Sequence, residues 1–245
     1  IMGGDARENM NMVGRPARRS KKEALLLLVV VVCRVRFAAA ATETVTLVSG
    51  NGYDVVVNTD DPDACTVTID NPEHAISDIG SGKKQLYLAG NDAITDLATL
   101  ESPLNGCTKW TLEDAGLYIV DADTLTGDGD LGPLSRLVAI TGKSHNMYSL
   151  YVNGNAGLTS LDGLAMLRGE LTGGIDIFDN PKLESIDALA GLTGIDTDGS
   201  GSYYSVRIMS NVKLRSIAFL RGALQGRTLS SRIMIKGNKE VMSCG

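Results

Sequence analysis

One pattern of apolar residues and asparagine recurs five times along this chain and constrains its fold more than any other feature. Each copy has apolar residues at its first and third positions, Asn at the sixth, and Leu, Ile or Val at the ninth. The longer copies add apolar residues at the twelfth and fifteenth positions. The copies begin at Leu86, Leu150, Ile175, Val206 and Ile233. Internal repeats of this length are typical of solenoid proteins, in which each unit stacks on the next.

The spacing within a copy predicts how each unit folds. Alternating apolar positions predict a short strand with those side chains pointing inward, and the later apolar positions return to the same core. The Asn follows where the chain turns out of the strand, and its side chain can bond neighbouring backbone groups there. We therefore expect a mainly β solenoid with a parallel sheet, irregular loops and a ladder of stacked asparagines. The predicted ladder contains Asn91, Asn155, Asn180, Asn211 and Asn238.

Two of these copies carry a resemblance to a known family. The runs Asn180-Pro-Lys-Leu-Glu-Ser-Ile and Asn211-Val-Lys-Leu-Arg-Ser-Ile resemble the receptor L domain family. The resemblance implies a right-handed parallel β-helix of leucine-rich-repeat-like turns over residues 65–245, and ligand binding at a cell surface. Unlike the animal receptors, the chain has no Cys-rich module, kinase domain or second complete lobe, which leaves binding or surface roles open.

The ends of this domain are also predicted from the sequence. Residues 42–64 are expected to form an N-terminal capping segment. Two weaker copies of the pattern lie at about residues 67–79 and 117–134. The fifth copy is cut short, so we expect the domain to continue beyond Gly245.

The first 41 residues differ from the rest and predict a secretory signal. Five basic residues between Arg15 and Lys22 precede an apolar run from Ala24 to Cys33, and four alanines end the segment. This order is typical of a signal peptide, here cleaved near Ala40 or Ala41. Arg34 and Arg36 are atypical and leave an uncleaved signal anchor, or an earlier cut, open. The apolar run is shorter than the roughly 20 residues that span a bilayer.

Charge after this segment excludes two classes of partner. Residues 1–41 hold 8 of the 23 Lys and Arg residues but 3 of the 29 Asp and Glu residues, so the remainder carries 15 basic and 26 acidic residues. Nucleic-acid phosphates and anionic lipids would be repelled. The predicted location is secreted or cell surface, with membrane contact only through a signal anchor or an anchor beyond Gly245.

Cysteine and acidic residues give no support for a metal centre. No pair has CxxC spacing, and an oxidising compartment would allow one disulfide among Cys65, Cys107 and Cys244, with Cys65–Cys107 favoured over the other two pairings. An acidic loop offers weak calcium candidates, but an EF-hand would need Gly and Glu at the sixth and twelfth positions, which are Thr126 and Gly132. A solvated loop is therefore preferred, and no cofactor is expected. The weak candidates are Asp121, Asp123, Asp128 and Asp130.

Candidate ligand residues lie at the second, fourth and fifth positions of the copies, which vary in sequence. Tyr87, Tyr151 and Phe178 could form an exposed aromatic strip, with Arg207 on the following turn. Such strips suit glycan or protein contacts, and the alternative is that these rings simply cover the sheet.

The favoured hypothesis is an extracellular ligand-binding or adhesion module that is not an enzyme. No Gly-x-Ser-x-Gly elbow occurs, and neither His74 nor His145 lies near a recognised nucleophile. One alternative is a structural cell-wall or surface-coat component. The other is a carbohydrate-active enzyme on a parallel β-helix, with Asp176 and Asp179 as paired carboxylates.

Overall fold

The structure is a computed structural model that describes residues 41–49, 53–70, 84–127, 130–144, 146–195, 204–226 and 232–239. The predicted signal segment, apart from Ala41, lies outside the described residues. The same holds for Asp128, both histidines and Cys244.

The described chain is mainly β with parallel sheets, which confirms that part of the prediction. Its strands are β1 (Thr42–Leu47), β2 (Tyr53–Asn58), β3 (Cys65–Ile69), β4 (Lys84–Ala89), β5 (Trp110–Leu112), β6 (Ala115–Val120), β7 (Leu137–Ile140), β8 (Tyr148–Asn153), β9 (Gly169–Leu171), β10 (Gly174–Phe178), β11 (Leu192–Ile195), β12 (Tyr204–Met209) and β13 (Arg232–Lys236). Its helices are α2 (Asp92–Leu104), α3 (Phe219–Ala223) and the 3-10 helices η2 (Gly132–Arg136), η3 (Asp162–Leu164) and η4 (Asp187–Gly191). Among the described residues, no helix is long and apolar enough to cross a bilayer.

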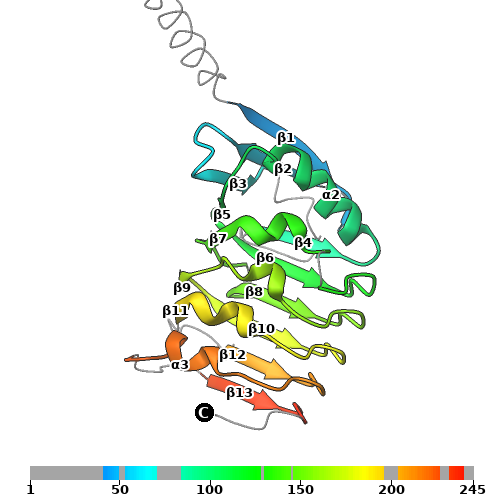
Figure 1. The fold of residues 1–245 in the computed structure, drawn as a ribbon, viewed down its shortest axis with the longest axis vertical. Helices are drawn as coiled ribbons and strands as arrows, with labels where there is room; N and C mark the ends of the chain where they lie inside the picture. Colours follow the sequence, from blue (N-terminus) through cyan, green and yellow to red (C-terminus); the bar gives the residue numbers. More distant parts are fainter. Residues whose placement is uncertain are drawn as a thin grey trace, which may run out of the picture. The chain divides into compact units, whose positions relative to one another are not determined.

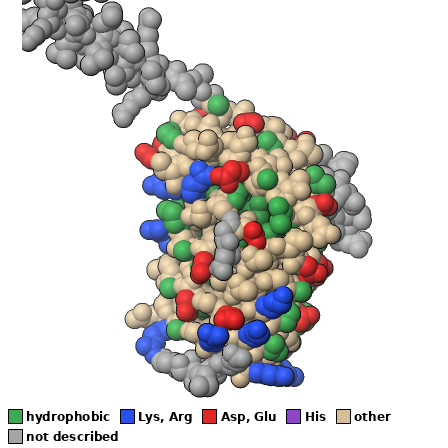
Figure 2. All heavy atoms as spheres, turned by 45° about the vertical axis from the view of Figure 1, so that its right-hand side comes forward, with side chains coloured by type: hydrophobic (Ala, Val, Ile, Leu, Met, Phe, Trp, Pro, Cys, Tyr) green, Lys and Arg blue, Asp and Glu red, His purple; other side chains and the backbone are tan. Residues whose placement is uncertain are grey.

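A six-stranded parallel sheet contains the predicted copies. Its strand order is β4-β6-β8-β10-β12-β13, so the strands of this sheet lie side by side in the order in which they occur in the chain (Figure 1). The first residues of the copies pair with one another in register, and the weak copy at Leu117 joins them as a full member. A one-residue slip would turn every inward side chain outward, so the apolar pattern fixes this register. Lys and Arg side chains gather at the end formed by β12 and β13 (Figure 2).

The opposite side of the molecule is less regular. One sheet has the order β1-β2-β3-β5-β7, in which the pairs β1–β2 and β2–β3 are antiparallel and the later pairs are parallel. A separate parallel pair, β9 and β11, follows. From β5 onward the chain alternates between the two sides, because β5, β7, β9 and β11 each precede a strand of the six-stranded sheet.

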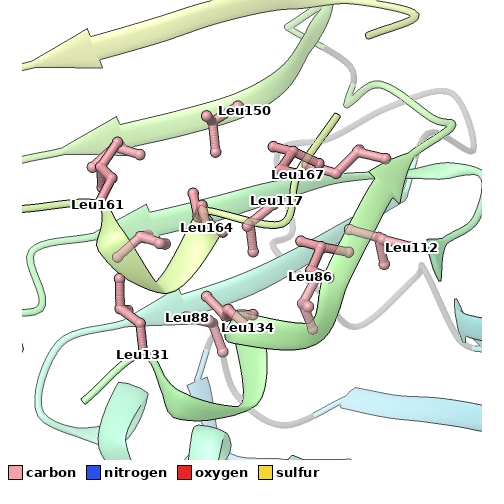
Figure 3. Packing of buried hydrophobic residues seen from close by; sticks show 14 of the residues in the cluster. Leu86, Leu88, Leu112, Leu117, Leu131, Leu134, Leu150, Leu161, Leu164 and Leu167 are labelled. Atoms are coloured by element: carbon pink, nitrogen blue, oxygen red, sulfur yellow. The ribbon is translucent and has the colours of Figure 1, made fainter. Parts of the chain in front are cut away.

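The core between the sides is aliphatic. Leu117 and Leu150 of the six-stranded sheet point toward Leu134 and Leu164 of the 3-10 helices, and all four are 0% exposed (Figure 3). Burying one such side chain stabilises the fold by about 2 kcal/mol. Trp110 is also fully buried, and its Nε1–H donates to the Pro133 carbonyl oxygen over 2.9 Å.

Four asparagines form a continuous chain of hydrogen bonds across the six-stranded sheet, at the C-terminal ends of its strands. The Asn155 backbone N–H and its Nδ2 both donate to Oδ1 of Asn180, over 3.1 and 2.9 Å. Asn180 bonds Asn211 in the same way over 3.0 Å, and Asn211 bonds Asn238. Each Nδ2 also donates to a strand carbonyl oxygen of the preceding unit. Asn155, Asn180 and Asn211 are 0% exposed, so these bonds satisfy polar groups that water cannot reach.

Asn91 does not belong to this chain of bonds, and its assignment to the ladder is wrong. It is exposed and precedes α2. The ladder position of the next unit is Ala122, which has no side-chain amide to bond Asn91. The Ala122 backbone N–H donates to Oδ1 of Asn155, so the ladder ends there. The rest of the first copy also differs, because residues 92–104 form a helix whose buried face includes Ala93, Leu97 and Leu100, while Ile94 is 43% exposed.

The residue before each ladder position is in the left-handed region. In all six units φ lies between 49° and 73°. Glycine adopts this conformation freely, and Asp tolerates it better than most residues. The fifth position of the copies is thus restricted by the turn rather than free for a ligand. These residues are Gly90, Asp121, Gly154, Asp179, Ser210 and Gly237.

Candidate ligand-binding face

The outer face of the six-stranded sheet carries one continuous file of side chains at the second position of each unit. Strand register aligns Tyr87 with Tyr118, Tyr118 with Tyr151, and the file continues through β10, β12 and β13. The whole file is Tyr87, Tyr118, Tyr151, Asp176, Arg207 and Met234. Tyr118 was not singled out from the sequence, although the second position of the weak copy at Leu117 was the signal that could have found it.

Four tyrosines contact one another at the β4–β8 end of this file. The rings of Tyr118 and Tyr151 are stacked, with centroids 4.6 Å apart and planes 10° apart. Tyr87 lies 6.4 Å from Tyr118, and Tyr148 lies 5.8 Å from Tyr151, both tilted. Tyr118 and Tyr148 are buried, whereas Tyr87 and Tyr151 are half-buried. The partly exposed rings of the cluster are therefore Tyr87 and Tyr151, and the buried ring of Tyr118 lies between them in the file.

The segment that enters β8 covers the middle of the cluster. The Tyr118 hydroxyl and the Ser144 hydroxyl share a hydrogen bond, and Ser144 is 0% exposed. Close approach requires glycine beneath this segment, since a Cβ atom on Gly116 would lie 2.6 Å from the Tyr148 carbonyl oxygen. Burial raises the pKa of Tyr118 well above its ordinary value, with the Ser144 hydrogen bond opposing this. Burial likewise raises the pKa of Tyr148 to about 12.

A buried ion pair continues the file. Asp176 is 0% exposed, and its Oδ1 and Oδ2 accept from Nε and Nη2 of Arg207 over 2.8 and 2.5 Å. The guanidinium also lies 5.0 Å from the Phe178 ring centroid, within cation–π range. Burial raises the pKa of Asp176 and Arg207 opposes this, while the hydrogen bonds to Asp176 raise the pKa of Arg207. The bidentate geometry requires an ionised carboxylate, so the pair is charged at neutral pH.

Phe178 is not in line with the tyrosines, which corrects the simple strip that the sequence suggested. It occupies the neighbouring file, in register with Asn153 on β8 and Met209 on β12. Asn153 donates from Nδ2 to the Tyr151 hydroxyl over 3.0 Å. The structure therefore brings Tyr87 and Tyr151 together through Tyr118, and brings Phe178 to Arg207.

The acidic loop is organised by hydrogen bonds. Asp130 Oδ2 accepts from the backbone N–H and the hydroxyl of Thr126, which lowers the pKa of Asp130. Asp123 Oδ1 accepts from the Ala156 N–H over 3.0 Å, and Asp121 is the left-handed residue of its unit. Within the described ranges, no group of three or more His, Cys, Asp or Glu side chains could hold a metal ion.

A separate depression lies on the other side of the molecule. It has a volume of about 530 Å³ and is lined mainly by residues around β5 and β7, among them Lys109, Thr111 and Val138. None of the tyrosines at the second positions of the units contributes to it.

No protein-family model, curated protein or solved structure matches this chain. The functional argument therefore rests on the geometry of the chain itself.

Proposed function

We propose that this chain is a secreted or cell-surface binding and adhesion module without catalytic activity, built as a right-handed β-helix of leucine-rich-repeat-like turns. In-register copies, the alternation between two sides and the asparagine ladder support this architecture. The Cys65–Cys107 disulfide, with Cα atoms 6.0 Å apart, supports an oxidising compartment. The likeness to receptor L domains belongs to the same proposal.

The observation that carries the binding role is the file Tyr87–Tyr118–Tyr151 beside the Asp176–Arg207 pair. Aromatic rings and Arg are enriched where proteins contact ligands, because they offer large apolar area together with directional hydrogen bonds. Here they lie on a sheet in which β6, β8, β10 and β12 each pair with a neighbouring strand on both sides. The proposed ligand face is this outer surface, with a protein or glycan as its partner.

The same geometry gives little support to the enzyme alternative. Both oxygens of Asp176 are bonded to Arg207, so neither is free to transfer a proton to a substrate. Asp179 lies three residues later, in the left-handed turn after β10, and therefore outside the strand that carries Asp176. A glycosidase needs two carboxyl groups facing one bond from opposite sides.

Binding of the full chain, expressed in a secreting host, to an array of glycans and cell-surface proteins tests the proposal. Saturable binding should fall by at least about tenfold when Tyr151 and Phe178 are both replaced by Ala. The matched control is Glu184→Ala with Arg215→Ala, which removes an exposed 2.9 Å ion pair beyond the ladder and should leave binding unchanged. A folded protein that binds nothing on the array would favour the structural-coat alternative.

A further inference from the structure

The depression over β5 and β7 has a volume and a lining that suit a small ligand. Its volume of about 530 Å³ lies within the range of about 300–1,000 Å³ that is typical of small-molecule sites. Half-buried Thr111, Val138 and Ala139 line it from two paired strands, and half-buried Met166 lines it from the connection between η3 and β9. A sheet surface with apolar side chains thus forms the floor of the depression.

A bulge on β7 explains why apolar side chains reach this surface. The register shifts between Trp110 and Thr111 on β5, so that Val138 has no residue opposite it. Val138 and Ala139 are both half-buried, although strict alternation along a strand would send one of them inward. Bulges re-aim side chains in this way and are over-represented next to functional sites.

Two basic side chains line the same depression without acidic partners. Lys109 precedes β5 and Arg168 precedes β9, and both are exposed. Neither forms an ion pair with any residue that the structure describes. Among the described lining residues Asp63 is the one acid, and its Oδ1 accepts from the Thr108 hydroxyl over 2.8 Å. The chain after residue 41 is strongly acidic as a whole, so a local excess of positive charge here favours an anionic group.

The Arg168 side chain is held in place by one of its own donors, which leaves the others for a ligand. Its Nε donates to the Met166 carbonyl oxygen over 2.9 Å, and its backbone N–H donates to the Val138 carbonyl oxygen over 3.1 Å. Within the described part of the chain, Nη1 and Nη2 bond no acceptor. A guanidinium can grip a carboxylate through two parallel hydrogen bonds. Lys109 lies on the other side of β7, roughly 10 Å away along the backbone layer, so its long side chain can reach the same group.

The wall that carries Asp63 and Lys109 is fixed before a ligand arrives. The disulfide between Cys65 and Cys107 lies two residues from each of them. The hydrogen bond from Thr108 to Asp63 joins the two segments a second time. A site that is already ordered loses less conformational entropy when it binds.

We propose that this depression binds a small organic carboxylate, with the carboxylate group between Arg168 and Lys109 and an apolar body on Val138 and Ala139. A singly charged group fits better than a doubly charged phosphate ester, because Asp63 on the same lining repels the second charge. Inorganic phosphate would leave the apolar floor uncovered. The site is separate from the tyrosines of the six-stranded sheet, and it does not depend on the function proposed for that face.

NMR titration of the isotope-labelled full chain tests the proposal with probes of one length, hexanoate, 1-hexanol and hexylamine, and with inorganic phosphate. Hexanoate should shift the backbone amides of Thr111, Val138 and Ala139 and should bind at least about tenfold more tightly than the other three probes. Equal binding of 1-hexanol, or tighter binding of hexylamine or phosphate, would overturn the carboxylate. The absence of a saturable shift at these amides with about 20 mM hexanoate would overturn the site itself.

Three variants separate the charge from the floor. Arg168→Ala should weaken hexanoate binding at least about tenfold and leave 1-hexanol binding unchanged. Ala139→Leu fills the floor and should weaken both probes, while amides outside the depression keep their wild-type positions. The matched control is Arg221→Ala, which removes an exposed cation on α3, outside the lining, and should change neither affinity. Equal losses in Arg168→Ala and Arg221→Ala protein would show that net charge attracts the probe, and no loss in Arg168→Ala protein would contradict the role of Arg168.

Discussion

The two outer strands of the six-stranded sheet, β4 and β13, differ in what covers their unpaired backbone groups. At β4, two side chains take the place of a neighbouring strand. The Tyr53 hydroxyl accepts from the Tyr87 N–H over 2.7 Å and donates to the Tyr87 carbonyl oxygen over 2.9 Å. The Ser49 hydroxyl does the same for Ala89 over 3.0 and 3.2 Å. Ser49 itself is fixed by Asp96 of α2, whose carboxylate accepts its backbone N–H.

At β13 the described residues provide no such cover. β13 pairs with β12 alone, and Ile235 is 41% exposed, whereas its in-register counterparts Ile208, Ile177 and Val152 are 0% exposed. Arg232 and Lys236 at the ends of the strand are exposed, and positive charge on an edge strand hinders pairing with another copy. Among the described residues, β4 is thus closed by hydrogen bonds and β13 carries charge, which predicts that equivalent substitutions cost more in the interior and at β4 than at β13.

The largest contrast is expected within the asparagine ladder. Asn180→Ala should lower the free energy of unfolding by about 5 kcal/mol, because it leaves the Asn155 N–H and the Val152 carbonyl oxygen buried without partners. Asn238→Ala, at the half-buried last rung among the described residues, should cost about 1 kcal/mol. Urea denaturation of both variants measures the difference. Equal costs would mean that the rung at Asn238 is as well enclosed as the rungs inside the sheet.

Removal of the disulfide near β4 should lower the free energy of unfolding nearly as much as Asn180→Ala does. Cys65 and Cys107 are 42 residues apart, and a loop of that length predicts a loss of about 4 kcal/mol in Cys65→Ser, Cys107→Ser protein. Urea denaturation measures the loss, and wild-type protein treated with a reductant should behave as the double variant does. A loss below about 1 kcal/mol would show that the packing of β3 and α2 holds this end without the cross-link.

Tyr53→Phe tests the closed edge itself. The substitution removes one oxygen atom and leaves the Tyr87 N–H and carbonyl oxygen without the partner that now occupies the edge, so a cost of about 2 kcal/mol is expected. Ile235→Thr on β13 is the contrasting variant and should cost about 0.5 kcal/mol, because its side chain is already 41% exposed. Sedimentation should also show more self-association for Tyr53→Phe than for wild type. If the two variants are equally stable, the inferred difference between β4 and β13 is wrong.

Alkaline titration gives the smallest effect, which is absent at neutral pH. Burial raises the pKa of Tyr148 to about 12 and that of Tyr53 further, from an ordinary value of 10.0. Since both folded-state values are raised, their contribution to stability is complete below pH 10 and is lost as the pH rises through and beyond 12. Tyrosinate absorbance should show ionisation that continues above pH 12, and Tyr53→Phe should reduce the amplitude of that late phase. A single transition near 10 would mean that neither hydroxyl is shielded from water.

The sequence predicted most of the six-stranded sheet and less of the tyrosine cluster and the Asp176–Arg207 pair on its outer face. The alternation at Leu150, Ile175 and Val206 was sufficient for strands in register, because one slipped residue would expose the core. The same pattern failed at residues 92–104, where a helical spacing of buried residues prevailed over the repeat. Tyr118 was missed because its copy lacks the ladder asparagine, with Ala122 in its place.

The sequence by itself determined the repeat and the mainly β character, because each follows from local spacing and from the need to bury alternate side chains. It also predicted the four asparagines of the ladder, but the same pattern wrongly added Asn91. Only the tertiary structure decided which side chains meet across strands. The pairing of Asp176 with Arg207 joins residues 31 positions apart, and the contact of Tyr53 with Tyr87 crosses 34. Such contacts depend on register and on the path of the loops, whose lengths differ from unit to unit. Local propensity carries no information about either, so the closed edge at β4 and the proposed ligand face emerged only when the units were stacked.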